Sequence, residues 1–255
     1  MRNSRLPFAL VVALPLLVLG VGTAFAEEDA ADPAQALLDE ITALTKAEDF
    51  SALVEAFAKV PDVYKASEND GLRDKLRAAM GKVARDKDGG DARVAAVEAF
   101  LELEDPKGAW KELSKLMPKG KEDEATAVDL AVVKAAGALA QSKSVKALGE
   151  LAMKAKDPAL AGAAAAALGG FREDNRNRGK ILEELIKVGQ RTRPGRSTTQ
   201  NPSQTALERW AKVEPGVVQG LNGLTGRSIS SFDEWEVLYK DNKKRPDALF
   251  LDEEG

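Results

Sequence analysis

Apolar side chains recur at intervals of three or four residues along most of the chain from residue 37 onward. This interval matches the turn of an α-helix, and no segment shows the sustained apolar–polar alternation that is typical of strands. The pattern therefore predicts an all-α protein of about a dozen short helices. The stripes include Leu37, Ile41 and Leu44; Leu72, Leu76, Met80 and Val83; Val128, Val132, Ala135 and Leu139; and Ile181, Leu185 and Val188.

Short polar signals mark where several of these helices start. An acidic N-cap residue stands before a proline at the first helical position in Asp32-Pro33, Asp105-Pro106 and Asp157-Pro158. Asn201-Pro202 has a similar form, with Gln204 placed to reach back to it, and Ser231 has capping-box spacing to Glu234. We expect a helix to start at each of these places.

The segment "DPALAGAAAAALGGF" (157–171) reads as a helix rather than a flexible linker. Alanine is the best helix former, and its seven alanines offset the cost of Gly162. Gly169-Gly170 is a natural helix stop. The small side chains predict an inner helix with neighbours packed closely on both sides.

A related pattern occurs twice upstream, which indicates repeats. "ARVAAVEAFLEL" (92–103) aligns with residues 160–171, and "VVKAAGALAQ" (132–141) repeats the middle of the pattern. Matching Phe100, Leu139 and Leu168 gives spacings of 39 and 29 residues. Periods of this size are typical of helix–turn–helix arrays.

These residues resemble the HEAT-repeat family. Its first helix usually reads Asp-Pro-x-Val-Arg-x-x-Ala-Ala-x-Ala-Leu-Gly-x-Leu, which residues 157–171 follow except that Ala161 stands at the arginine position. The segments 144–155 and 179–189 resemble second helices, and "LTGRSISSFDEWEVLYKDNKK" (224–244) resembles the end of exported bacterial HEAT-repeat proteins. The resemblance implies a right-handed α-α superhelix with a short C-terminal helical cap, which binds other macromolecules and has no catalytic residues.

The resulting domain plan has five parts. Helical repeats are expected over 27–192, a flexible loop over 193–203, capping helices over 204–246 and an acidic tail over 247–255. Residues 1–26 form a predicted signal peptide, because Arg2 and Arg5 precede an apolar stretch that ends in Ala24-Phe25-Ala26. Cleavage after Ala26 predicts a periplasmic or secreted protein with no membrane span after cleavage, whereas an uncleaved stretch from Leu6 to Ala26 would be a membrane anchor.

The amino-acid composition excludes several kinds of active site. The 255 residues include no cysteine and no histidine, so thiol nucleophiles, disulfides and the commonest general base and metal ligands are excluded. We expect no catalytic residues, no cofactor and no metal. The formal net charge of −4 is too small to indicate a polyanion partner for the chain as a whole.

One basic strip stands out in this acidic chain. Residues 172–196 hold eight basic and four acidic residues, a local charge of +4. Such a strip indicates either a contact with an acidic protein or an anionic envelope polymer, or a solvated turn between repeats. The candidate binding residues are Arg172, Arg176, Arg178, Lys180, Arg191, Arg193 and Arg196.

The sequence thus favours an exported, non-catalytic scaffold that binds a protein or an anionic envelope polymer through its helical-repeat surface. Export and the lack of interleaved aromatic residues disfavour nucleic acid. One alternative is a glycan-acting enzyme, which would need two carboxyl groups about 5–10 Å apart in a cleft. The other is a self-assembling structural module, which would need a large apolar patch outside the core.

Overall fold

The computed structural model describes residues 32–195 and 202–251, so the predicted signal peptide lies outside it. The described residues form eleven α-helices, three 3-10 helices and no strand, which confirms the all-α prediction. The α-helices are α1 (Pro33–Ala47), α2 (Phe50–Ala66), α3 (Asp70–Arg85), α4 (Gly90–Ala99), α5 (Pro106–Leu113), α6 (Ala127–Ala138), α7 (Val145–Lys154), α8 (Pro158–Ala167), α9 (Arg178–Thr192), α10 (Gln204–Thr225) and α11 (Phe232–Asn242). The 3-10 helices are η1 (Ser142–Ser144), η2 (Leu168–Phe171) and η3 (Pro246–Leu249).

Four of the five predicted helix starts are confirmed. Asp32, Asp105 and Asp157 each accept a hydrogen bond from a backbone N–H of the first turn, at 2.8–2.9 Å. Ser231 accepts from the Glu234 N–H at 3.3 Å. The predicted start at Asn201-Pro202 is wrong, because Ser203 is the N-cap of α10 and accepts from the Ala206 N–H at 3.2 Å. Serine is as good an N-cap as asparagine, so residue type did not separate the two positions.

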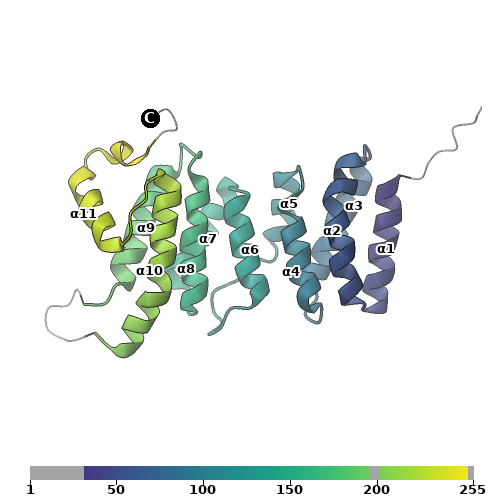
Figure 1. Cartoon of the computed structure of the whole chain (residues 1–255), viewed down its shortest axis with the longest axis horizontal. Coiled ribbons are helices and arrows are strands. Elements are labelled where there is room, and N and C mark those ends of the chain that lie inside the picture. The colour runs from purple at the N-terminus through teal and green to yellow at the C-terminus, as the bar shows by residue number, and fades with distance from the viewer. Residues whose placement is uncertain (1–31, 196–201, 252–255) are drawn as a thin grey trace, which may run out of the picture. The chain divides into compact units, whose positions relative to one another are not determined.

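The helices from α1 to α10 form two layers (Figure 1). In the even layer, α2, α4, α6, α8 and α10 contact one another in chain order. In the odd layer, α1 contacts α3, α3 contacts α5, and α7 contacts α9. Each odd helix also packs on the even helix that follows it. Exposed side chains of odd helices and of even helices therefore belong to different surfaces.

The core consists of two apolar clusters that meet at α6. Val132 and Ala135 of α6 belong to the cluster of α1–α5, whereas Val133 and Ala136 belong to the cluster of α7–α11. The α6 helix thus buries two adjacent faces, one in each cluster. Trp110 of α5 is half-buried and contacts both clusters.

The α8 helix is packed closely on both sides, as its alanines predict. On one side Gly216 and Gly220 of α10 lie against the backbone of Gly162 and Ala165. On the other side Gly137 of α6 lies so close to α8 that a Cβ there would be 2.8 Å from the Ala167 Cα. Ala161, Ala164 and Ala165 are fully buried. Small residues on three consecutive even helices allow this short separation between backbones.

The predicted helix stop at Gly169-Gly170 lies close to the observed end of α8, but the predicted reason for it, a glycine C-cap, is wrong. The α-helix ends at Ala167, but the chain continues as η2 through both glycines, and neither has a positive φ. Both are instead required by close contacts. A Cβ on Gly169 would be 2.9 Å from the Gly220 carbonyl oxygen, and one on Gly170 would overlap the Gly137 carbonyl.

The C-terminal elements complete the apolar cluster of α7–α11. Gly226 ends α10 in the left-handed conformation, with φ 75°, which glycine adopts without the cost of a Cβ. Phe232 and Trp235 of α11 are fully buried. An acidic tail is predicted over 247–255, whereas the structure buries Leu249 and Phe250 in the core. Two apolar side chains thus order a segment whose overall composition is acidic.

Candidate functional site

The predicted basic strip does not form a single free surface. Arg172 donates to the Leu251 carbonyl oxygen, and the Arg178 guanidinium lies 4.5 Å from the centre of the Phe250 ring. Both side chains therefore hold the C-terminal segment. Arg227, which the sequence did not single out, donates to the carbonyl oxygens of Leu249 at 2.7 Å and Ala248 at 2.9 Å.

Arg193 is engaged in a different contact. Its guanidinium pairs with Asp233 at 2.8 Å and with Glu236 at 3.2 Å, both on α11. The beginning of the predicted flexible loop is thereby fixed to the last α-helix. We conclude that Arg193 stabilises the cap, so its replacement would not test binding alone.

The remaining predicted residues divide into three exposed side chains and one undescribed residue. Arg176 lies in the turn before α9, and Lys180 and Arg191 lie on α9. Lys180 and Arg191 are three helical turns apart and share one face of the helix. Arg196 lies outside the described residues.

Lys180 belongs to a groove of about 490 Å³ between α7 and α9, in the odd layer. Val145, Met153 and Ile181 give the groove an apolar lining, and Gly149 leaves room for the Glu184 side chain. A Cβ at Gly149 would be 2.5 Å from the Glu184 Oε2 atom. The groove is also lined by Lys146, Lys154, Lys180, Lys187 and Glu150.

Most of the groove lysines have no acidic partner. Lys187 pairs with Glu183 at 3.8 Å. Lys146, Lys154 and Lys180 form no ion pair with any residue in 32–195 or 202–251. The lining holds four lysines and two carboxylates, Glu150 and Glu184, so its formal charge is positive. Such a groove can bind an anionic group and bury an apolar one beside it.

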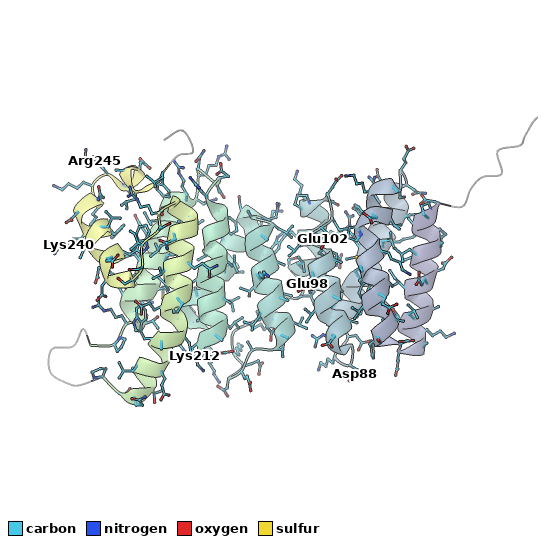
Figure 2. All side chains as sticks on the ribbon, in the orientation of Figure 1. Asp88, Glu98, Glu102, Lys212, Lys240 and Arg245 are labelled. Atoms are coloured by element: carbon cyan, nitrogen blue, oxygen red, sulfur yellow. The ribbon has the colours of Figure 1, made fainter. Side chains whose placement is uncertain are left out.

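The groove is part of a wider asymmetry of charge between the layers. The five odd helices hold 14 basic and 8 acidic residues, whereas the five even helices hold 6 basic and 7 acidic residues. Figure 2 shows Glu98 of α4 and Lys212 of α10, which belong to the even layer. Sequence reasoning missed this feature, because the basic residues of the odd helices are separated along the chain by neutral helices.

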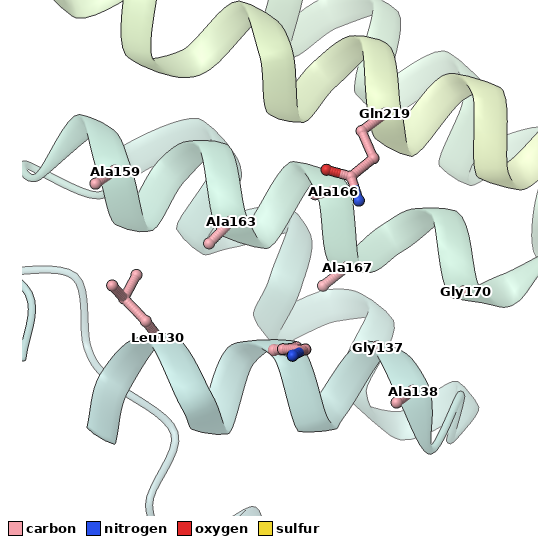
Figure 3. Close-up of a pocket in the computed structure, with 10 residues that line it drawn as sticks. Leu130, Gly137, Ala138, Ala159, Ala163, Ala166, Ala167, Gly170 and Gln219 are labelled. Carbon is pink, nitrogen blue, oxygen red and sulfur yellow. The ribbon is translucent and has the colours of Figure 1, made fainter. Parts of the chain in front are cut away.

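A second hollow, of about 560 Å³, lies on the even layer between α6 and α8 (Figure 3). Ala159, Ala163 and Ala167 of α8 line it opposite Leu130 of α6. Among the described residues, Lys134 is the one charged side chain that lines it. The hollow exists because alanine side chains are short, and its lining has little chemistry to select a ligand.

A charged hollow between α2, α3 and α5 is lined by several carboxyl groups, the residue type on which the enzyme alternative depends. Arg77 pairs with Asp74 and Asp105 and donates to the Tyr64 hydroxyl oxygen at 2.9 Å. The Tyr64 O–H in turn donates to Asp105 at 3.2 Å. Asp105 is also the N-cap of α5. These carboxylates link three helices, so the geometry favours a structural role.

Glu112 of α5 forms a similar link to α3. Burial alone would raise the pKa of its carboxyl group, but hydrogen bonds from Lys115 at 2.7 Å and Arg85 at 3.2 Å outweigh burial and lower the pKa. A general acid in catalysis needs the opposite shift. The carboxylate of Glu112 is therefore suited to binding cations within the fold.

We expect Glu112→Gln to reduce stability in a pH-dependent way. Because the folded pKa lies below the usual 4.5, the stabilisation is complete above that pH and is lost as the pH falls through the folded pKa. At pH 7 the substitution should cost about 1–2 kcal/mol of unfolding free energy. Urea titrations of both proteins between pH 7 and pH 3 measure this difference, which should shrink below about pH 4.5.

Glu102→Gln is the control, because Glu102 is exposed and forms no ion pair among the described residues. It should change the unfolding free energy by less than about 0.5 kcal/mol at either pH. An equal effect of the two substitutions would contradict the role given to Glu112.

Comparison with known proteins gives no information about the function of this site. No family model matches the chain, and no curated protein and no solved structure matches it either. Among the described residues, no helix is long and apolar enough to cross a membrane. The same residues contain no group of three or more acidic side chains that could hold a metal ion.

Proposed function

We propose that this protein is an exported, non-catalytic scaffold of HEAT-like helix pairs, arranged as a right-handed superhelix, that binds an anionic partner through its odd layer. The partner is an acidic protein or an anionic envelope polymer. The groove between α7 and α9, with its three unpaired lysines and apolar lining, is the observation that carries the proposal.

Two further features support this function. The even helices contact one another in chain order, and the odd helices do so from α1 to α5 and from α7 to α9, as expected for stacked helix pairs. The odd layer is basic in a protein whose formal net charge is −4, so a positive field acts at one surface.

The alternatives receive less support. The carboxylates of the charged hollow are engaged with Arg77 and with the start of α5. The large apolar side chains that are most exposed, Val54, Leu207, Val237 and Leu251, belong to separate elements of the described chain. Self-assembly would instead be expected from one contiguous apolar patch.

The experiment is a capture from envelope extract with residues 27–255 and with a Lys146→Gln, Lys154→Gln, Lys180→Gln triple variant. We expect the wild-type chain to retain a partner in a salt-sensitive manner, and the triple variant to bind that partner about tenfold more weakly. The partner, once purified, is titrated against both proteins to measure the ratio of dissociation constants.

The control is a triple variant of Lys134, Lys212 and Lys240 to glutamine, which makes the same change in net charge. These exposed lysines lie on α6, α10 and α11, outside the odd layer, and Figure 2 shows Lys212 and Lys240. This variant should bind within about twofold of wild type. Equal losses in the two variants, or no retained partner for the wild type, would contradict the proposal.

A further inference from the structure

The last described residues, 246–251, lie in a site built by several separate parts of the fold. Arg172, next to η2, donates to the Leu251 carbonyl oxygen, and Arg227, after α10, donates to the carbonyl oxygens of Ala248 and Leu249. The Leu251 N–H donates to the Thr225 carbonyl oxygen at 2.8 Å. These contacts are made to the backbone of the segment, so any peptide could make them.

Two side chains of the segment add selectivity. Leu249 is fully buried, and Phe250 is 8% exposed, with the Arg178 guanidinium over its ring. The Leu251 side chain is 46% exposed. The site therefore accepts a leucine followed by an aromatic residue, and leaves the next side chain in solvent.

We propose that residues 246–251 are the resident ligand of a peptide-binding site, from which a partner peptide of the same chemistry can displace them. That partner is a peptide segment with a leucine–aromatic pair, which supplies the two side chains that the site buries. The inference does not rest on the proposed function, because this site is separate from the groove between α7 and α9.

Exchange of the segment follows from the balance of its contacts. Ordering six residues costs backbone entropy, whereas the burial that offsets it comes from two side chains. Lys243, Lys244 and Arg245, which connect the segment to α11, are exposed. Because the segment belongs to the same chain, its effective concentration at the site is high, and a partner peptide displaces it only at sufficient concentration or affinity.

The test titrates a fluorescent peptide, RPDALFLDEEG (residues 245–255), into the full chain and into its Phe250→Ala variant. We expect the variant to bind the peptide about tenfold more tightly than the wild-type chain, because its own segment competes less well. Adding Arg227→Gln to the variant should weaken binding about tenfold. A full-chain Leu251→Ala control should bind within about twofold of wild type, because the Leu251 side chain is exposed.

Hydrogen exchange of the wild-type chain provides a second measurement if the Phe250→Ala variant does not fold. The amides of Phe250 and Leu251 should exchange about a hundredfold faster than those of Leu221 and Leu224 in α10. Equal rates in the two segments would overturn the proposal, as would a folded Phe250→Ala variant that does not bind the peptide. Concentration-dependent dimers of the wild-type chain would assign the site to a second copy and also overturn it.

Discussion

Gly216→Ala is expected to lower the free energy of unfolding by about 3 kcal/mol, at the upper end of the range for an overpacked core. The added Cβ would lie 2.7 Å from the Gly162 Cα and closer still to the Gly162 carbonyl group. All of these atoms are backbone, so no side chain can rotate away and α10 must separate from α8. Thermal unfolding should show a decrease in Tm of about 6–12 °C for a domain of this size.

Gly179→Ala provides the matched control for this prediction. Gly179 lies in α9, and a Cβ there would meet nothing within 4 Å. Alanine should therefore stabilise the chain by about 0.5–1 kcal/mol, since it reduces the entropy of the unfolded state. A Gly216→Ala variant as stable as wild type would show that α8 and α10 are not in backbone contact.

Trp235→Ala is expected to lower the free energy of unfolding by about 4 kcal/mol. The Trp235 side chain is fully buried, and its indole N–H donates to the Asn222 Oδ1 atom at 3.0 Å. Asn222 also bonds both backbone groups of Ile229, so it fixes the turn between α10 and α11. The substitution leaves a cavity and removes one partner of Asn222, and a urea titration measures the combined loss.

Val237→Ala tests whether this cost comes from burial. Val237 is on the same helix but is 61% exposed, so its truncation should change the unfolding free energy by less than about 0.5 kcal/mol. Trp235→Phe should fall between the two, because it retains most of the apolar volume and loses the hydrogen bond. Similar stabilities for the Trp235→Ala and Val237→Ala variants would contradict the packing described for α11.

Local features of the fold could be predicted from the sequence because their causes are local. The helical period and the caps at Asp32, Asp105 and Asp157 depend on residues within one or two turns. The close packing of α8 could also be predicted, since a helix without large side chains must lie near its neighbours. The reason for Gly169-Gly170 could not, because it lies in the carbonyl groups of Gly137 on α6 and Gly220 on α10.

The candidate site shows the limits of sequence reasoning more clearly. Seven basic residues are predicted to bind a partner, yet Arg172 bonds a carbonyl group 79 positions away and Arg193 pairs with an acid 43 positions away. Such distant partners leave no signal in a local pattern. Lys180 does line a groove, but Lys146 and Lys154 join it only because α7 and α9 are neighbours in the odd layer.

The division of the core at α6 has a consequence for cooperativity. Each cluster has its own set of buried side chains, and α6 contributes side chains to both. The two clusters are therefore coupled through α6 and through side chains such as Trp110 that contact both. Heat or denaturant should therefore melt the array in two coupled steps rather than one. The α7–α9 groove and the site of residues 246–251 both belong to the cluster of α7–α11, so both should be lost in the same unfolding step.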